Sequence, residues 1–364
     1  MGVEEEFVLV DPATGAVALE APRVLKSLGE DPGVMAEFMR FQVETATDVR
    51  TRLDEVRSDL VRLRRLVADA AGGVGCLVVA SGMPPCGDLP GLRAVTPDPR
   101  YLVLAERFPS LVADAGTCAC HVHVGIPSRE LGAQVLAGLR PWLATLLAIS
   151  ANSPFVHGRD SGWASRRYVL WSRWPTARPP EAWPGAAAYD ASIEDMVRSG
   201  SAMDARGAYF YARLSPRHPT VEVRVADVCL DVGDAVLLAG LVRGLVVTGL
   251  DQARRGARPR PVRSSLVKAS LSIAARNGLS GPGIDVFSGG AASPARLVDA
   301  LLERIRPALR AHGDLDEVER GLEAVLDRGT GATVQRALHA DAASPAEFVA
   351  RLAAVSLGES RAGR

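Results

Sequence analysis

The sequence predicts an α+β fold, because strand patterns fill the first two-thirds of the chain and helix patterns fill the last third. The 364 residues are 48% hydrophobic and 23% charged, which supplies enough apolar side chains for a large core. Strand-like alternation ends near Asp231, and helical spacing follows it. We therefore expect a single domain over residues 1–364 that is strand-rich over 1–230, helical over 231–356 and flexible over 357–364.

Short β-branched or alternating segments in the strand-rich part are typical of strands. They cover residues 3–10, 41–45, 76–80, 119–126, 208–214 and 220–225, with residues 16–19 as a candidate hairpin arm. Apolar residues at helical spacing predict a helix over 52–71, which a glycine pair ends. Residues 98–115 and 128–150 are also expected to be helical, and Pro141 is expected to kink the second of these helices.

The helical part has the spacing of five helices, at residues 232–256, 262–276, 294–311, 314–328 and 345–356. Within the strand-rich part, residues 152–163 have the composition of a polar loop, and the proline-rich residues 174–187 are expected to form a mobile surface connection. The apolar helix over 128–150 is more hydrophobic than one buried stripe requires, which favours a homodimer.

Charge and cysteine content narrow the class of protein. The formal net charge is +0, from 42 basic and 42 acidic residues, so nothing indicates binding to nucleic acid or to an anionic membrane. Five cysteines at irregular spacing do not make a disulfide framework. The opening MGVEEEFVLV has no basic segment of a signal peptide, and no apolar run looks long and uncharged enough to span a bilayer. We expect a cytoplasmic protein.

Three of the predicted strands combine an apolar face with a face that carries carboxylates, because successive side chains on a strand point to opposite sides. The polar faces hold Glu4 and Glu6, Gln42 and Glu44, and Glu222 and Arg224. Glu5 falls on the opposite face, with Val3 and Phe7. A single strand with alternating glutamates is usually only a solvated face. Three such strands in one chain favour a shared acidic site.

The stretch TCACHVHVG, residues 117–125, places two cysteines beside two histidines. On a strand, His121 and His123 share one face, whereas Cys120 points the other way and Cys118 joins it if the strand extends that far. A regular strand therefore cannot direct all four side chains at one tetrahedral zinc ion. We expect the cysteines to be small buried hydrophobic residues.

The two histidines then belong with the carboxylates. A set of glutamates plus one imidazole suits Mg²⁺ or Mn²⁺ better than zinc. Arg224 beside these carboxylates indicates that an anion also binds. The chain has no Walker A motif and no GxGxxG after a strand, so metals and arginines must hold the phosphates of any nucleotide.

A series of motifs in fixed order resembles the carboxylate–amine ligase family related to glutamate–cysteine ligase, type 2. The motifs are GVEEEF (2–7), QVET (42–45), HVHVG (121–125), NSPF (152–155), SGWASRR (161–167), RWPT (173–176) and PTVEVRVAD (219–227). The resemblance runs from the first residue to about Arg255. It implies a glutamine-synthetase-like fold, in which an antiparallel sheet forms a funnel around the active site and helices pack outside.

The resemblance also implies roles for individual residues. The metal ligands it implies are Glu4, Glu6, Glu44, His121 and Glu222. The ATP contacts it implies are His123, Arg224, Arg167 and Arg213. Arg224 is expected at the transferred phosphate, and Arg167 at the phosphate or the substrate carboxylate. The implied catalytic residues are Glu222, Arg224 and Arg167. Three departures stand out: Ala119-Cys120 replaces Gly-Met, Phe210-Tyr211 replaces Trp-Asp, and Leu214 replaces Pro. We expect the second to alter the acceptor pocket.

The implied activity is an ATP-dependent ligase that joins a carboxylate to an amine through an acyl phosphate, with Mg²⁺ or Mn²⁺ as cofactor. Glutamate and cysteine are the default substrates, and another carboxylate or amine remains open. Two other classes also remain open: a metal-dependent hydrolase that activates water with the same ligands, and a binding module without turnover. The expected partners are small-molecule substrates only.

Overall fold

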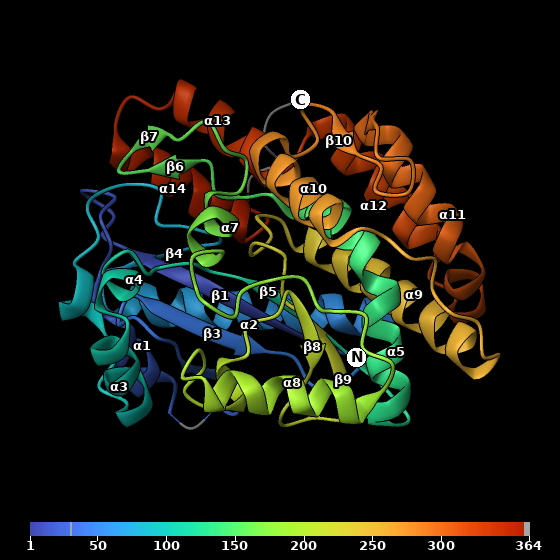
Figure 1. Ribbon diagram of the computed structural model, residues 1–364. Coiled ribbons are helices and arrows are strands. Elements are labelled where there is room, and N and C mark those ends of the chain that lie inside the picture. The colour runs from blue at the N-terminus through green and yellow to red at the C-terminus, as the bar shows by residue number, and fades with distance from the viewer. Residues whose placement is uncertain (30, 360–364) are drawn as a thin grey trace.

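The computed structural model describes residues 1–29 and 31–359, and it is built on one antiparallel sheet (Figure 1). The strand order is β2-β3-β1-β5-β9-β8, and β4 also pairs with β1. Their bounds are β1 Gly2–Val10, β2 Val34–Ala36, β3 Gln42–Ala46, β4 Leu77–Val79, β5 Cys120–Gly125, β8 Ala212–Leu214 and β9 Thr220–Val223. Every pairing between these strands is antiparallel. The α+β prediction is confirmed.

Helices make up most of the rest of the described chain. They are α1 Ala21–Leu28, α2 Leu53–Gly73, α3 Pro99–Arg107, α4 Pro109–Ala113, α5 Arg129–Leu139, α6 Leu143–Ser150, α7 Arg166–Trp171, α8 Ala186–Arg198, α9 Val232–Arg254, α10 Ser264–Asn277, α11 Pro294–His312, α12 Leu315–Arg328, α13 Gly331–Asp341 and α14 Pro345–Ser356. The other elements of the described chain are short. Three are 3-10 turns, at Gly91–Ala94, Arg140–Trp142 and Ala205–Gly207. Two are small hairpins, β6 Phe155–Val156 with β7 Arg159–Asp160 and β10 Gly283–Ile284 with β11 Ala291–Ala292.

Several element predictions need correction. The helix predicted over 98–115 is two helices, because Pro109 has no N–H to continue α3 and instead begins α4. The strand predicted over 208–214 is only three residues long, and α1, α7, α8 and α13 were not predicted. Residues 174–187 are not a purely surface segment, since Thr176 and Trp183 are buried. Of the predicted flexible tail, residues 360–364 lie outside the described residues.

Two helical stretches are apolar and long enough to cross a membrane by composition, contrary to the sequence-based expectation. They are Arg129–Ser150, which the 3-10 turn at Pro141 interrupts as predicted, and α9. Most of each lies inside the fold, where α9 contacts α2, α5, α11 and α12. The apolar surface of residues 128–150 is therefore covered within one chain and gives no separate reason for a dimer. The homodimer stays a prediction.

The two faces of the sheet have different surroundings. Helices α2 and α9 pack against β1, β3 and β5 and bury the apolar face (Figure 1). On this face, Glu5 pairs with the fully enclosed Arg64 of α2, at 2.5 and 2.9 Å. The other face carries the polar side chains of the alternating strands. Because α2 and α9 cover only the apolar face, the polar face lines a cavity, and residues of α3, α4 and α7 form part of the opposite wall of that cavity.

Candidate active site

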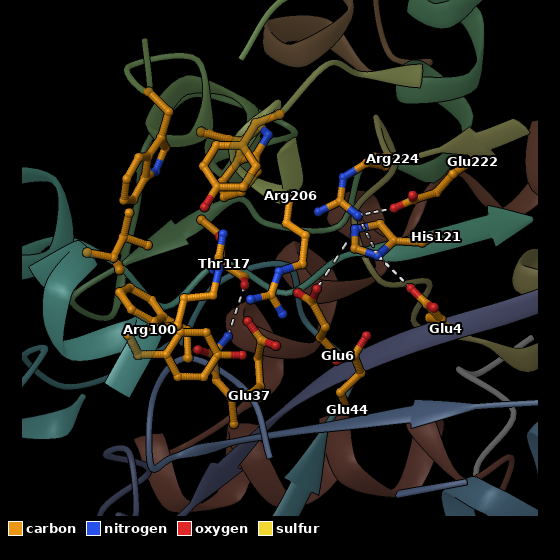
Figure 2. Close-up of a pocket in the computed structure, with 18 of the residues that line it drawn as sticks. Glu4, Glu6, Glu37, Glu44, Arg100, Thr117, His121, Arg206, Glu222 and Arg224 are labelled. Atoms are coloured by element: carbon orange, nitrogen blue, oxygen red, sulfur yellow. Dashed lines mark hydrogen bonds and ion pairs between the residues drawn. The ribbon is translucent and has the colours of Figure 1, made fainter. Parts of the chain in front are cut away.

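Strand register brings the predicted polar residues together at the centre of the sheet (Figure 2). Glu4 of β1 lies opposite His121 of β5, and His123 lies opposite Glu222 of β9. Glu6 lies opposite Glu44 of β3. Residues directly opposite on antiparallel strands share a face. The face predicted from side-chain alternation is therefore real, and all five proposed ligands line one cavity of ≈ 540 Å³.

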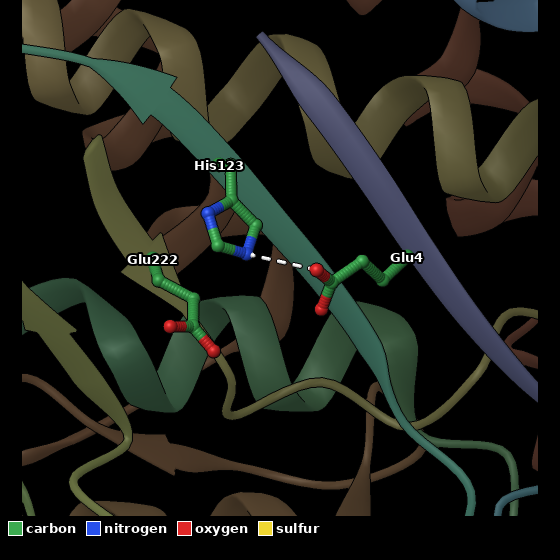
Figure 3. Close-up of side chains that lie close together, drawn as sticks. All are labelled: Glu4, His123 and Glu222. Atoms are coloured by element: carbon green, nitrogen blue, oxygen red, sulfur yellow. Dashed lines mark ion pairs between the residues drawn. The ribbon is translucent and has the colours of Figure 1, made fainter. Parts of the chain in front are cut away.

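Two groups of side chains in this cavity can each hold a cation, and both use Glu4. One group is Glu4, His123 and Glu222 (Figure 3), and the other is Glu4, Glu44 and His121. Within each group the ligand atoms lie within 4.8 Å of one another. Glu4 is 3.1 Å from His121 Nδ1 and 3.4 Å from His123 Nε2. The geometry thus places His123 as a candidate ligand, whereas the resemblance implies a neighbour of phosphate.

The carboxylates of Glu6, Glu37 and Glu44 are too crowded to be charged together without a cation. Burial and then the charge of Glu37 raise the pKa of Glu6 to about 8. Burial, Glu37 and Glu4 also raise the pKa of Glu44 well above its ordinary value. Glu6 belongs to neither cation group, and its Oε2 accepts a hydrogen bond from the Ala119 N–H at 2.7 Å. A divalent cation would relieve this repulsion, so the residues present fit Mg²⁺ or Mn²⁺.

Glu37 is a member of the acidic site that sequence analysis missed. It follows the three-residue strand β2 and lines the cavity, where its charge helps to raise the pKa of Glu44. Burial raises its pKa. In the sequence, the segment VMAEFM shows no repeated alternation of polar and apolar residues, so only the acidic residue type pointed to it.

Burial and neighbouring charges keep the candidate metal ligands in the protonation states that metal binding requires, a neutral imidazole and ionised carboxylates. Burial and then Arg224 lower the pKa of His121 to about 4, so the imidazole is neutral and can ligate a metal at neutral pH. Burial opposes ionisation of Glu222, but Arg224 and Arg213 outweigh it and hold its pKa far below the ordinary value. Glu4 behaves similarly: burial opposes its ionisation, but its pairing with His121 and His123 outweighs burial and lowers its pKa.

The guanidinium of Arg213 donates its hydrogen bonds to protein oxygens. Its Nε and Nη2 donate to Glu222 at 2.8 and 3.1 Å, and its Nη1 donates to the backbone carbonyls of Arg206 and Ala208 at 3.0 and 3.2 Å. Arg224 also pairs with Glu222 and lies 3.4 Å from His121 Nδ1. Arg213 therefore orients a candidate metal ligand. Its predicted contact with nucleotide stays a prediction.

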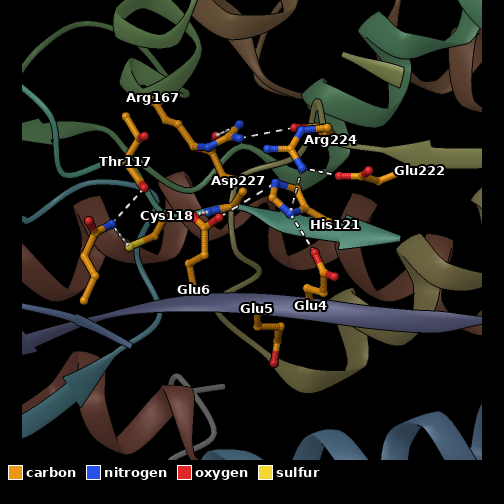
Figure 4. Close-up of polar contacts among 12 residues, drawn as sticks. Glu4, Glu5, Glu6, Thr117, Cys118, His121, Arg167, Glu222, Arg224 and Asp227 are labelled. Atoms are coloured by element: carbon orange, nitrogen blue, oxygen red, sulfur yellow. Dashed lines mark hydrogen bonds and ion pairs between the residues drawn. The ribbon is translucent and has the colours of Figure 1, made fainter. Parts of the chain in front are cut away.

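Arg167 belongs to a buried network behind the cavity (Figure 4). Its Nη1 and Nη2 each donate at 3.2 Å, to the carbonyls of Val225 and Arg224. Asp227 lies 3.8 Å from Nη1 and accepts hydrogen bonds from Asn152 N and the hydroxyls of Ser153 and Ser165. This network explains why the NSPF, SGWASRR and VAD motifs occur together. Arg167 still lines the cavity, but at least two of its donors face protein oxygens.

The two cysteines of TCACHVHVG separate onto different sides of the sheet. Cys120 lies opposite Glu5 and is fully buried on the apolar side, as predicted. Cys118 precedes the strand, which begins at Cys120, and its Sγ accepts a hydrogen bond from Gln42 Nε2 at 3.2 Å on the polar side (Figure 4). The strand does not extend to Cys118, so the condition for Cys118 to join Cys120 is not met, whereas both cysteines are buried as predicted. Neither cation group of the described residues includes a cysteine.

We expect Cys118→Ser and Cys120→Ala to leave metal dependence unchanged. A serine hydroxyl can still accept from Gln42, and the loss of Cys120 costs packing only, about 1 kcal/mol or somewhat more. Elemental analysis of the purified protein should show no stoichiometric zinc. One zinc per chain that disappears in both variants would contradict this assignment.

The departures at Phe210 and Tyr211 do not line the cavity. Phe210 is fully buried against Trp183, with ring centroids 5.1 Å apart, and Tyr211 packs against Tyr168 at 5.5 Å. Among the described residues around the cavity, neither is present. Leu214 is likewise buried and packs near Gly132. These side chains fill the protein behind the wall of the cavity, and the prediction that Phe210-Tyr211 alters the acceptor pocket stays a prediction.

Comparisons with solved structures identify the fold. The structure of a glutamate–cysteine ligase from Francisella tularensis in complex with AMP matches with a TM-score of 0.73 at 14% identity, over 99% of this chain and 89% of that one. A bifunctional glutathione synthetase from Pasteurella multocida matches with a TM-score of 0.68 at 14% identity, over 98% of this chain and 52% of that one. The chain has the glutamine-synthetase-like fold that these ligases share.

Sequence comparison gives the family. The model of glutamate–cysteine ligase family 2 matches residues 1–354, and the chain belongs to this family. A relative in Mycolicibacterium smegmatis, provisionally named glutamate–cysteine ligase 2-3, is 40% identical over 98% of both chains. Another in Salinispora arenicola, provisionally named glutamate–cysteine ligase 2, is 43% identical over 92% of this chain and 89% of its own.

Proposed function

We propose that the chain is an ATP-dependent carboxylate–amine ligase, with glutamate and cysteine as the first substrates to test. The observation that carries the proposal is the double use of Glu4 by two cation groups, with Arg224 beside them. Adjacent cations and an arginine on one face suit a polyphosphate that must be held and polarised. The AMP in the Francisella relative agrees with nucleotide use.

The proposed ligation needs no nucleophile from the protein, because the enzyme contributes mainly by positioning the two substrates and ATP. A carboxylate oxygen attacks the γ-phosphorus of ATP, the bond to ADP breaks, and an acyl phosphate forms. The amine nitrogen then attacks the acyl carbon, loses a proton, and releases phosphate as the amide forms. In this proposal Arg224 stabilises the transferred phosphoryl group, while Arg213 holds Glu222 in place. Bound by Glu4, Glu44, Glu222 and the two histidines, Mg²⁺ or Mn²⁺ would neutralise phosphate charge.

The test is ADP release in the presence of Mg²⁺, with carboxylates and amines supplied separately and together, and mass spectrometry of the products. Amide formation that needs both substrates supports the proposal. ADP release that proceeds at full rate without any amine and yields no amide would instead support the metal-dependent hydrolase. We also propose a cytoplasmic location, which agrees with five cysteines that are all free and buried.

A further inference from the structure

The two ring nitrogens of His123 have different surroundings. Nδ1 lies 2.9 Å from the hydroxyl oxygen of Thr220, the first residue of β9. Nε2 is buried and has no hydrogen-bond partner within the described part of the chain. It points toward Glu4 Oε1, 3.4 Å away, inside the candidate cation group (Figure 3). One nitrogen of the ring is therefore anchored, and the other is free to bind a ligand.

Strand register explains why Thr220 reaches this histidine. His123 of β5 lies opposite Glu222 of β9, and Thr220 lies opposite Gly125. Thr220 and Glu222 are two residues apart on one strand, so their side chains share the polar face. Gly125 has no side chain, and the hydroxyl of Thr220 meets the diagonal neighbour, His123. One strand thus supplies a carboxylate of the cation group and the hydroxyl that holds its histidine.

The position of this hydroxyl is well defined. The Thr220 N–H donates to the His218 carbonyl at 2.8 Å, and the Thr220 carbonyl accepts from the Ser215 N–H at 3.0 Å. A β-branched side chain also has a restricted χ1 angle. The ring of His218 packs edge-on against that of His123, with centroids 6.0 Å apart, but this contact does not select a ring nitrogen. The hydroxyl does select one, because it lies at Nδ1.

His121, the other candidate imidazole ligand, is held differently. Its Nδ1 lies 3.1 Å from Glu4 Oε2 and 3.4 Å from Arg224 Nη1. Charged side chains therefore orient His121, whereas a neutral hydroxyl orients His123. Removal of the Thr220 hydroxyl should act on one histidine, and hence on one of the two cation groups.

We propose that Thr220 is a positioning residue for the cation group of Glu4, His123 and Glu222. His123 Nδ1–H donates to Thr220 Oγ1, and this bond leaves the lone pair of Nε2 for the cation. Histidines that bind metals generally donate their other ring N–H to an oxygen acceptor, which fixes the tautomer and the orientation of the ring. The inference rests on the proposed function, which uses cations on this face.

Calorimetric titration with Mn²⁺ tests the proposal without turnover. Thr220→Val keeps the branched shape but removes the hydroxyl. It should weaken one of two Mn²⁺ sites by about 10- to 100-fold, the usual cost of losing an outer hydrogen bond to a metal ligand. Added to Glu44→Gln it should leave both sites weak, whereas added to Glu222→Gln it should leave one site at parent affinity. Thr220→Ser keeps the hydroxyl and should bind Mn²⁺ as the parent does.

The tautomer of His123 is a second readout, which a merely structural role of Thr220 would not move. Nitrogen chemical shifts of isotope-labelled histidine distinguish a ring nitrogen that carries a proton from one that does not. In the Mg²⁺-bound parent, the His123 signals should show the proton on Nδ1. These signals can be assigned by their loss in His123→Gln. Thr220→Val should lose this single tautomer, and Thr220→Ser should retain it.

Thr45→Val is the matched control. Thr45 of β3 is buried opposite Glu5, on the apolar side of the sheet, and its hydroxyl lies 3.4 Å from the Glu5 carbonyl. Both Mn²⁺ sites should survive this substitution. The proposal is overturned by a parent with fewer than two Mn²⁺ sites, by a Thr220→Val variant with both sites intact or equally weakened, or by a Thr220→Ser variant as weak as Thr220→Val. A proton on Nε2 of His123 in the Mg²⁺-bound parent also overturns it.

This proposal and the ligase function can fail separately. If Thr220→Val weakens one Mn²⁺ site as expected but the parent forms no amide with any amine, the ligase function fails and the positioning role stands. If the parent forms an amide and Thr220→Val changes neither Mn²⁺ binding nor the tautomer of His123, the positioning role fails and the ligase function stands.

Discussion

Glu4→Gln should reduce Mg²⁺-dependent ADP formation by at least about 10³-fold, since electrostatic contacts in active sites are each worth about 10²- to 10³-fold. Glu4 is the one side chain that belongs to both cation groups of the described residues. The amide keeps the shape but removes the charge that both cations would share. Initial rates of ADP release over a range of Mg²⁺ concentrations measure the effect. A variant with parent-like activity would show that the cations bind elsewhere.

Two further variants give the control for this result. Glu44 and Glu222 each belong to one group, so Glu44→Gln and Glu222→Gln should each weaken one Mn²⁺ site in a calorimetric titration, whereas Glu4→Gln weakens both. Unfolding cannot account for such losses if the metal-free variants melt at or above the parent's temperature. We expect that outcome for Glu44→Gln, because the substitution removes one charge from a crowded acidic cluster.

The central part of the fold could be predicted from the sequence because a strand has a strict two-residue period. Alternation alone placed Glu4 with Glu6, His121 with His123, and Glu5 on the other side, and the register confirms each placement. It did not predict which strands pair, because pairing depends on contacts between distant segments. The ordered motifs supplied that information through the resemblance to a known family.

The parts of the site that sequence could not predict lie outside regular alternation. Glu37 follows a strand of only three residues, and Arg206 of the cavity wall lies in a single 3-10 turn, so neither belongs to a repeating pattern. Cys118 shows the limit of alternation most clearly. The strand begins at Cys120, two residues after Cys118. The Cys118 side chain therefore escapes the alternation, lies on the polar side and contacts Gln42.

Glu5 was placed correctly on the apolar face, but a buried carboxylate there requires a partner that alternation does not name. The partner is Arg64, on the buried face of α2 beside Leu60 and Val67. Its donors reach two Glu5 oxygens and three backbone carbonyls, those of Cys229, Leu230 and Ser356, at 2.5 to 2.9 Å. This one side chain ties the strand that bears the candidate ligands to the end of α14.

Arg64→Met should destabilise the protein by about 3–5 kcal/mol, the usual cost of removing one partner of a buried ion pair. The methionine fills part of the space but leaves the Glu5 carboxylate and three carbonyls without donors. The double variant Glu5→Gln/Arg64→Met should lose less than the sum of the two single variants, because the buried charge is gone. Urea denaturation measures these free energies of unfolding. Arg65→Met, at the exposed neighbouring position of the same helix, should change stability by no more than about 0.5 kcal/mol. Equal effects at positions 64 and 65 would mean that the ion pair contributes nothing beyond helix propensity.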